Sequence, residues 1–176
     1  MIRPAQRTDL GSIMALEQEA FEPTQRWSEP SWLGELTQPN HRVFVSINPD
    51  VDGVVCGHIV ANVADLNRIT VANRSRRNGI GRELLAAFCD WALGAGAAKI
   101  MLEVACDNVA AGELYRSYGF INVGLRANYY GCGIDACVMQ LALEVSAPSS
   151  SCALRLRAVS QDRYTGLRPA PGQREV

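Results

Sequence analysis

Residue types that could bind an anion come together at the start of one predicted helix. The candidate ligands are Arg76, Arg77, Asn78, Gly79, Ile80, Gly81 and Arg82. The first amides of a helix have no partner inside the helix, and the aligned peptide dipoles place about half a positive charge there. The two glycines allow the backbone to turn tightly and to approach a ligand closely. The stretch therefore predicts a backbone-built site for an anion of pyrophosphate size.

A second candidate for chemistry is Glu103, which interrupts the apolar stretch "KIMLEVA". Burying a carboxylate is costly unless the group is hydrated or paired. Two interpretations stay open. Glu103 either reaches an open edge of the sheet and has no function, or faces a cleft where it can accept a proton.

A third candidate pair is Asn108 and Tyr115, seven residues apart with the small Ala111 between them. Two helical turns put them on one face of a helix. A tyrosine hydroxyl, with an ordinary pKa of about 10, can donate a proton to a departing thiolate. The alternative is that Tyr115 is a core residue of an amphipathic helix and Asn108 a plain N-cap.

The elements that must position these residues follow from periodicity. A strand (66–71), a turn (72–80), a helix (81–95) and a strand (99–105) form a strand–helix–strand crossover, which predicts two parallel strands. The helix then begins beyond the carboxyl end of the first strand. The anion site and Glu103 should therefore lie near the same end of the sheet.

The remaining segments complete an α/β fold. Further strands are expected at 1–5, 42–47, 54–63, 120–130 and 135–143. Further helices are expected after a cap at Thr8 or Asp9, after a cap at Ser28 with Pro30 in the first turn, and from Asp107 or Asn108 to Gly119. This gives a central mixed sheet of about seven strands with four helices.

Composition excludes several classes of protein. The chain has 176 residues, is 48% hydrophobic and carries a formal net charge of −1, so no global field points to nucleic acid or a membrane. Neither a signal peptide nor an apolar stretch long enough to span a bilayer is seen, which predicts a cytoplasmic protein. The six cysteines form no C-x-x-C pair and only two histidines are present, so we expect no metal and reduced cysteines.

The end of the chain differs from the rest. "SAPSSS" begins a segment without usable periodicity, so residues 146–176 are expected to be a disordered tail and residues 1–145 to form one domain.

Three interpretations of the turn at 76–82 compete from the residues alone. One is a glycine turn with solvated arginines. A dinucleotide-binding turn would need glycine where Leu84 stands, and a P-loop would need Gly-Lys-Ser/Thr. The third interpretation is a resemblance.

"ITVANRSRRNGIGRELL" resembles the acyl-CoA signature of the GNAT family of N-acetyltransferases, with Arg76, Gly79 and Gly81 at the signature positions. "LEVACDNVAAGELYRSYGF" and "RANYYGCGIDACVM" are similar to the RimI-type branch that acetylates the N-terminal alanine of ribosomal proteins. Asn73 stands where many members have proline, which should change only the stiffness of the turn. The resemblance covers about residues 1–144 and implies the GNAT fold.

The resemblance also implies a function and roles for residues. Acetyl-CoA would be the co-substrate, held by the turn at 76–82, by the strand residues Ile69, Thr70 and Val71, and by Asn108. Glu103 would accept a proton from the acceptor amine, and Tyr115 would bind the cofactor and protonate the leaving sulfur. Residues expected at the acceptor entrance are Trp27, Ser28, Trp32, Tyr129 and Tyr130.

The acceptor would then be a protein N-terminus, with the alanine of a small-subunit ribosomal protein as the leading candidate. A broader acetyltransferase of lysines or small amines and a non-catalytic acyl-CoA-binding module remain as alternatives. A covalent route through Cys106 is also conceivable, because this thiol is close in sequence to Glu103.

Overall fold

The computed structural model describes residues 1–131 and 133–144. The tail expected at 146–176 lies outside these residues, as do Cys132 and Cys152. The strands are β1 (Ile2–Pro4), β2 (His41–Ile47), β3 (Val51–Val60), β4 (Val63–Val71), β5 (Lys99–Ala105), β6 (Ile121–Arg126) and β7 (Ala136–Ala142). The α-helices are α1 (Leu10–Ala20), α2 (Glu29–Thr37), α3 (Ile80–Gly94) and α4 (Val109–Ser117). Short 3-10 helices are η1 (Arg7–Asp9), η2 (Pro23–Gln25) and η3 (Asn73–Ser75).

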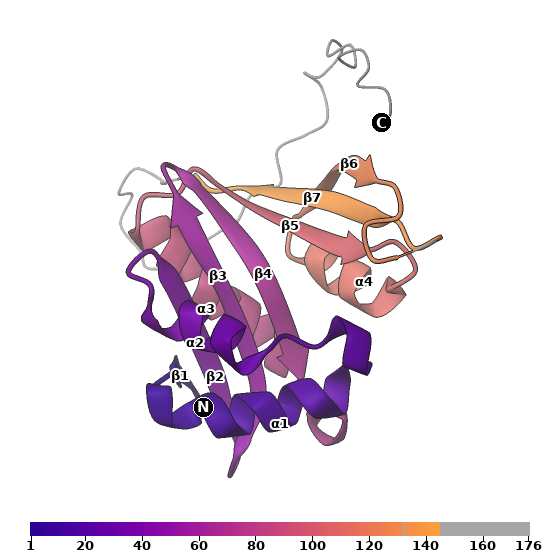
Figure 1. Cartoon of the computed structure of the whole chain (residues 1–176). Coiled ribbons are helices and arrows are strands. Elements are labelled where there is room, and N and C mark those ends of the chain that lie inside the picture. The colour runs from indigo at the N-terminus through magenta and orange to yellow at the C-terminus, as the bar shows by residue number, and fades with distance from the viewer. Residues whose placement is uncertain (132, 145–176) are drawn as a thin grey trace, which may run out of the picture.

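The strands of the described residues form one mixed sheet in the order β1-β2-β3-β4-β5-β7-β6. Only β4 and β5 are parallel, as the crossover predicted, and the other neighbours are antiparallel. In Figure 1, α1 and α2 lie in front of the sheet and α3 lies behind it. The predicted α/β fold, with about seven strands and four helices, is confirmed.

The parallel pair separates after four residues. The β4–β5 register runs from Val63–Lys99 to Leu66–Leu102 and then ends, although β4 continues to Val71 and β5 to Ala105. Figure 1 shows the two strands diverging from this point. A gap thus opens in the middle of the sheet, between the strand that leads to α3 and the strand that carries Glu103.

Two apolar clusters cover the two faces of the sheet. The first joins α3 and α4 to the sheet and contains fully buried Leu84, Phe88 and Leu102. The second joins α1 and α2 to β2 and β3 and contains fully buried Ile13 and Trp32. Because β5 alternates between the faces, Leu102 and Val104 join the first cluster, and Glu103 faces the opposite side.

Local chemistry explains several boundaries that the sequence predicted. The Ser28 hydroxyl caps α2 by accepting from the Ser31 amide at 3.3 Å, and the Asn108 side chain caps α4 by accepting from the Ala111 amide at 3.1 Å. Gly119 ends the segment after α4 with a positive φ of 102°.

Other predicted boundaries were wrong. The hairpin between β3 and β4 turns at Ala61 and Asn62, not at 64–65, because Ala61 adopts a positive φ of 53° that no glycine or proline announces. The predicted strand 120–130 ends at Arg126.

Asp9 stands at the N-cap of α1, as one of the two predicted caps, but its carboxylate binds Arg3 at 2.8 Å and the Gln6 amide at 2.7 Å instead of an amide of that helix. Arg3 thereby lowers the pKa of Asp9, with the backbone hydrogen bond adding to the effect against desolvation.

Candidate active site

The turn between β4 and α3 presents a row of backbone amides. Gly79 is the N-cap of α3 with a φ of 83°, and Arg77 also has a positive φ of 66°. The Arg76 amide donates to the Asn73 oxygen at 3.4 Å, and the next amides that donate to a backbone carbonyl are those of Arg82 and Glu83, both to the Gly79 oxygen, at 2.9 and 3.1 Å. Among the described residues, the amides of 77–81 donate to no backbone carbonyl, so they can bind an anion.

Gly79 and Gly81 are glycines for different structural reasons. A Cβ on Gly79 would meet open space, so its positive φ is the reason for glycine there. A Cβ on Gly81 would lie 3.4 Å from the Leu114 side chain of α4. Gly81 therefore allows α3 to begin close against α4.

The arginines of the turn are used in different ways. Arg76 donates from Nε to the Val71 oxygen at 3.2 Å, and Arg82 donates to the Ser117 hydroxyl at 3.0 Å. These two side chains fix the end of β4 and join α3 to α4. Arg77 and Asn78 are exposed beside the amide row, and Ile80 packs against the first apolar cluster.

The three strand residues expected at the cofactor lie beside the gap. Ile69 and Val71 pack against the first apolar cluster, while Thr70 pairs in register with Val54 of the second. The buried Thr70 hydroxyl has no partner within the described residues. All three follow Leu66, where pairing with β5 stops, so their backbone groups on that side have no strand beside them.

Glu103 lies across the gap on β5. Its carboxylate is 3.1 Å from the Arg126 guanidinium, and its main-chain oxygen accepts from the Tyr130 hydroxyl at 3.0 Å. The Glu103 side chain is 28% exposed, so it is reachable from solvent. That Glu103 faces a cleft and accepts a proton there stays a prediction.

Tyr115 approaches from the other face of the sheet. It is 4% exposed and packs on Phe120 with the ring centroids 5.6 Å apart. Burial raises the pKa of Tyr115 well above the usual range, and the nearby Tyr130 adds to the effect. The hydroxyl is protonated at neutral pH, as it would be at its ordinary pKa, and burial makes it a weaker acid.

Asn108 can hold a ligand while it caps α4. Its side-chain oxygen accepts from the Ala111 amide, which leaves the carboxamide NH₂ as a donor.

The expected acceptor-side residues do not all line an entrance. Tyr129 and Tyr130 are 50% and 39% exposed and pack edge to face, and Trp27 is half-buried. Trp32 is fully buried in the second cluster beneath Trp27, so the prediction for it was wrong: the helical spacing of α2 turns it into the core. Ser28 is exposed, but its hydroxyl is engaged in capping α2.

Sequence reasoning missed a buried ion pair beneath the acceptor side. Arg68 of β4 binds Glu17 of α1, donates to the Gln25 oxygen at 3.2 Å and lies 4.1 and 4.6 Å from the ring centroids of Phe21 and Trp27. Desolvation lowers the pKa of Arg68, and the charge of Glu17 opposes that effect. Arg68 is a charged residue within the predicted strand "LNRITV", just as Glu103 is within "KIMLEVA", and this could have marked it. Its partner Glu17 is 51 residues away, so the sequence did not show the pair.

The cysteine prediction was also wrong in part. Cys106, at the end of β5, forms a disulfide with Cys137 of β7, while Cys56 and Cys89 are buried thiols. Non-local pairing of the strands brings the two sulfurs together, which spacing along the chain could not show. The disulfide also removes the free thiol that a covalent route through Cys106 would need.

Among the described residues no group of three or more His, Cys, Asp or Glu could hold a metal, and the expectation of no metal stays a prediction.

Comparison with known proteins gives consistent matches. The family model described as "Acetyltransferase (GNAT) family" matches residues 9–120. N-alpha-acetyltransferase RimI of Mycobacterium tuberculosis is 34% identical over 140 residues, which are 76% of this chain and 87% of that protein. An uncharacterized protein of Mycobacterium leprae is 44% identical over 140 residues, but this chain spans only 38% of its length.

A solved structure shows the same fold. The ribosomal-protein-S18-alanine N-acetyltransferase of Escherichia coli superposes with a TM-score of 0.75 at 29% identity, covering 86% of this chain and 98% of that one.

Proposed function

The chain belongs to the acetyltransferase (GNAT) family, a family of acyltransferases, and from this premise we propose that it transfers acetyl from acetyl-CoA to the α-amine of a protein. The leading acceptor is the N-terminal alanine of a small-subunit ribosomal protein, as the name of the Escherichia coli structure suggests. The reaction would take place in the cytoplasm, with neither nucleic acid nor a membrane as a direct partner.

One observation carries the proposal. The open amides of 77–81 follow β4 and the carboxylate of Glu103 is on β5, and these are the two strands that border the gap in the sheet. The amide row would suit a diphosphate, and the part of β4 that is not paired with β5 separates it from the level of Glu103. A ligand with an anion at one end and a reactive group at the other would therefore be aligned along the gap.

Acetyl-CoA would supply an acetyl thioester at this place. The backbone of residues 77–81 would hold its diphosphate, with Arg77 and Asn78 beside it, and the free edge of β4 at Ile69, Thr70 and Val71 would bind the arm. Asn108 would donate to the same arm from across the gap.

The acceptor amine needs to lose a proton, because an α-amine has a pKa of about 8. Glu103 would receive that proton directly or through water, and its side chain is partly exposed on the face where the acceptor can arrive. The free amine then attacks the thioester carbonyl, and transfer is direct.

The sulfur that leaves needs a proton, and Tyr115 would provide it. The hydroxyl is protonated at neutral pH, and because burial raises its pKa it would give up the proton only to the strongly basic thiolate that forms as the thioester breaks. Because Tyr115 and Glu103 approach from opposite faces, the proton donor and the proton acceptor do not compete for one position.

The acceptor entrance would lie between Trp27 and the paired tyrosines Tyr129 and Tyr130. The rings expose apolar surface beside charged groups, which suits an extended peptide end. Ser28 would border this entrance with its backbone, since its hydroxyl is occupied.

The function is tested by offering two peptides to the full chain with acetyl-CoA. One begins with alanine and has no lysine, and the other has a blocked α-amine and one internal lysine. We expect CoA release and a mass gain on the first peptide only. Acetylation of the lysine peptide alone would support the broader acetyltransferase instead.

A variant separates catalysis from binding. Glu103→Gln should lower kcat by about 100-fold or more while acetyl-CoA still binds by calorimetry. If this variant bound acetyl-CoA and the wild-type chain acetylated no amine, the chain would be a non-catalytic binding module. Mass spectrometry of ribosomal proteins exposed to the enzyme and acetyl-CoA would identify the natural acceptor.

A further inference from the structure

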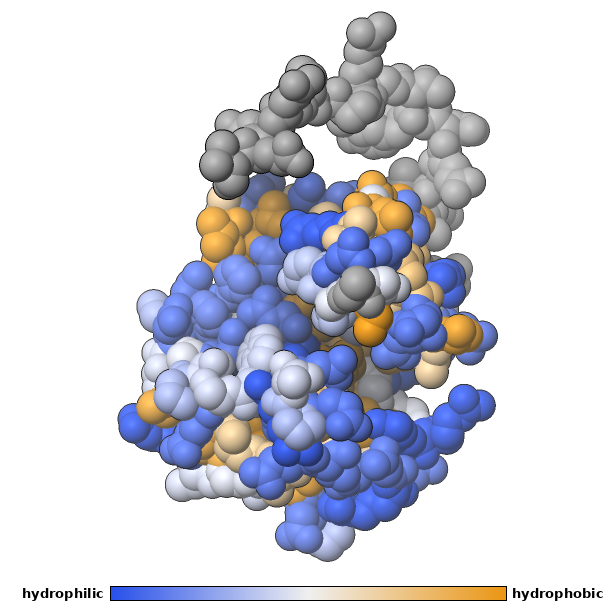
Figure 2. Space-filling model, turned by 45° about the vertical axis from the view of Figure 1, so that its right-hand side comes forward, coloured by the Kyte–Doolittle hydropathy of each residue, from blue (hydrophilic) through white to orange (hydrophobic). Residues whose placement is uncertain are grey.

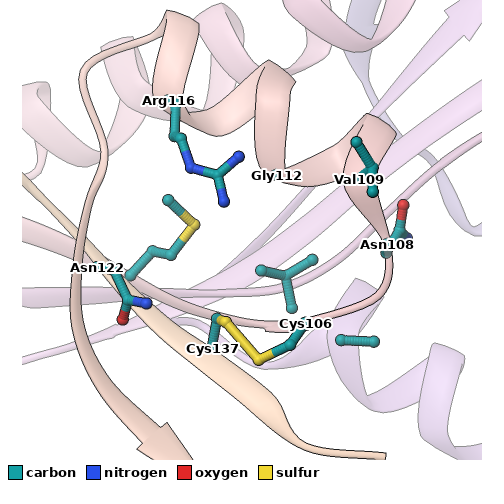
Figure 3. A pocket seen from close by; sticks show the side chains of 10 residues that line it. Cys106, Asn108, Val109, Gly112, Arg116, Asn122 and Cys137 are labelled. Carbon is teal, nitrogen blue, oxygen red and sulfur yellow. A yellow bond between two sulfur atoms is a disulfide. The ribbon is translucent and has the colours of Figure 1, made fainter.

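The disulfide between Cys106 and Cys137 lies at the edge of the candidate site. The Cα atoms of the two residues are 5.3 Å apart, a separation typical of disulfides. Figure 3 shows the two sulfurs bonded below α4, between the end of β5 and the start of β7. The bond joins segments 31 residues apart in the sequence.

The disulfide borders a pocket that opens to solvent. Cys106 is exposed, Cys137 is half-buried, and both line a pocket of about 70 Å³ that opens to solvent. Asn108, Arg116 and Asn122 line the same pocket, and Figure 3 shows them around it. A thiol with anionic groups could therefore approach the bond beside the Arg116 cation.

The other two described cysteines behave differently. Cys56 and Cys89 are buried, and burial raises the pKa of both thiols, that of Cys89 to about 12. The thiolate is the reactive form, so these two should stay reduced and unreactive. Among the described cysteines, thiol–disulfide exchange is therefore expected at Cys106 and Cys137.

The bond lies next to residues that the proposed reaction uses. Cys106 follows Glu103 by three residues and precedes Asn108, the cap of α4, by two. Cys137 is in the strand that follows the loop with Tyr130, whose hydroxyl donates to the Glu103 oxygen. The disulfide thus joins the β5–α4 connection to the start of β7, just after the loop that carries Tyr130.

Without the bond, main-chain contacts would still hold the two strands. The Cys106 amide donates to the Asp135 oxygen at 2.9 Å, and the β5–β7 ladder ends at the Ala105–Ala136 pair. Reduction should therefore leave the fold intact and loosen only the segment between β5 and α4.

We propose that Cys106 and Cys137 form a reversible thiol–disulfide site whose oxidised state strengthens acetyl-CoA binding by fixing the residues before α4. The effect on acetyl-CoA rests on the proposed function, whereas the sulfur chemistry does not.

The exchange is balanced with a disulfide as the oxidant. The thiolate of Cys106, the more exposed of the two, attacks one sulfur of oxidised glutathione and releases one glutathione thiolate. The Cys137 thiolate then attacks the Cys106 sulfur of the mixed disulfide and releases the second. The protein loses two electrons and two protons, and the two glutathione molecules that form carry them.

The test uses the full chain in a Cys132→Ser/Cys152→Ser background, so that the cysteines outside the described residues cannot exchange. The protein is equilibrated with reduced and oxidised glutathione in defined ratios, alkylated, digested and mapped by mass. We expect Cys106 and Cys137 to become protected together, in one peptide pair, while Cys89 stays a thiol. Continued alkylation of Cys106 and Cys137 at every ratio, in folded protein, would overturn the proposal.

Function is measured on the same samples. The oxidised form should bind acetyl-CoA about five-fold more tightly than the reduced form by calorimetry, a coupling within the usual range. Cys137→Ser and Cys106→Ser should each give one affinity at every ratio, equal to that of the reduced form, and Cys89→Ala should respond as the parent does. Equal affinity of the two redox states would overturn the coupling.

Loss of the proposed function would look different. If the redox state changed acetyl-CoA affinity but no amine were acetylated in either state, the proposed reaction would fail and the thiol site would stand.

Discussion

At the scale of single residues, Glu103 has a cationic neighbour before any acceptor arrives. The Arg126 guanidinium lies 3.1 Å from one carboxylate oxygen and 5.5 Å from the centre of the Tyr129 ring. Arg126 is 55% exposed, so it can move away at small cost. A protonated acceptor amine and Arg126 would then compete for the same carboxylate.

This competition gives a prediction for Arg126→Gln. Exposed ion pairs are worth about 0.2–1 kcal/mol, so removing the competitor should lower the KM for the acceptor peptide by up to about five-fold. The KM for acetyl-CoA should not change. Arg7→Gln, an exposed arginine beside β1, is the matched control for net charge. A rise in the acceptor KM would show instead that Arg126 helps to bind the peptide.

The raised pKa of Tyr115 gives a second prediction at this scale. A raised pKa means that the hydroxyl loses its proton only at a pH above its ordinary value of 10.0. Turnover should therefore not fall through Tyr115 ionisation between pH 8 and 10. Tyr115→Phe keeps the buried ring and should lower kcat by about 100-fold at all pH values while acetyl-CoA still binds.

The pH–rate profile of the wild-type chain and binding calorimetry of the variant check this. A wild-type alkaline limb well below pH 10 that Tyr115→Phe removed would contradict the position of Tyr115 in the core.

At the scale of elements, a β-bulge in β4 changes which face of the sheet its side chains point to. The register with β3 passes from Cys56–Arg68 to Gly57–Leu66, so Asn67 is the extra residue. Asn67 donates to Glu35 of α2 at 3.0 Å and the next residue, Arg68, binds Glu17 of α1. The bulge thus directs two successive polar side chains to the same face, beside the point where β4 leaves β5.

The close packing opposite the bulge predicts the effect of Gly57→Ala. A Cβ there would lie 2.1 Å from the Asp65 oxygen and 2.6 Å from the Phe88 ring. The backbone cannot move without breaking the ladder, so we expect a loss of about 3 kcal/mol or more in the free energy of unfolding. Denaturant melts measure it.

Gly11→Ala is the matched control for this variant. Gly11 lies in α1, where a Cβ would meet nothing within 4 Å. That change should raise the free energy of unfolding by about 0.5–1 kcal/mol. Equal effects of the two variants would contradict the packing around Gly57.

The sequence predicted features that depend on residues close together in the chain and missed those that depend on residues far apart in it. The cap at Ser28, the glycine turn at Gly79 and the parallel crossover follow from neighbours in the chain, and all three were found. The Glu17–Arg68 pair, the bulge at Asn67 and the disulfide each need strands or helices brought together by the fold. In each case the sequence shows a residue that is unusual for its element, but it does not show which distant residue is the partner.

Trp32 shows the other limit. Its type and position beside Trp27 suggested an entrance, yet only burial decides between a core tryptophan and a surface one. The residues of the candidate site were predicted where a residue type is unusual for its element, as with a carboxylate in an apolar strand, and their roles stay predictions.

At the scale of the whole molecule, the face shown in Figure 2 is mostly hydrophilic. The exposed apolar side chains lie in small separate groups on the face shown in Figure 2, and those of β6 are the largest such set on one strand. No described helix has the length and apolar character needed to cross a bilayer.

The domain boundary gives a prediction at this scale. The seven strands and four helices described end at Ala142, and the family match ends at residue 120. We propose that residues 146–176 are not needed for transfer. A chain that stops at residue 145 should keep the melting temperature and the kcat/KM of the full chain on an alanine-starting peptide. A loss of activity on a whole ribosomal protein, with the peptide unaffected, would show that the tail recognises the acceptor.

The early end of the β4–β5 ladder has a consequence for how this enzyme can change. It leaves main-chain groups of two interior strands without a partner strand. Recognition through such groups does not depend on which side chains the strands carry. If these groups bind the acyl donor as proposed, the surrounding side chains can change toward new acceptors during evolution while the donor site is kept with the fold.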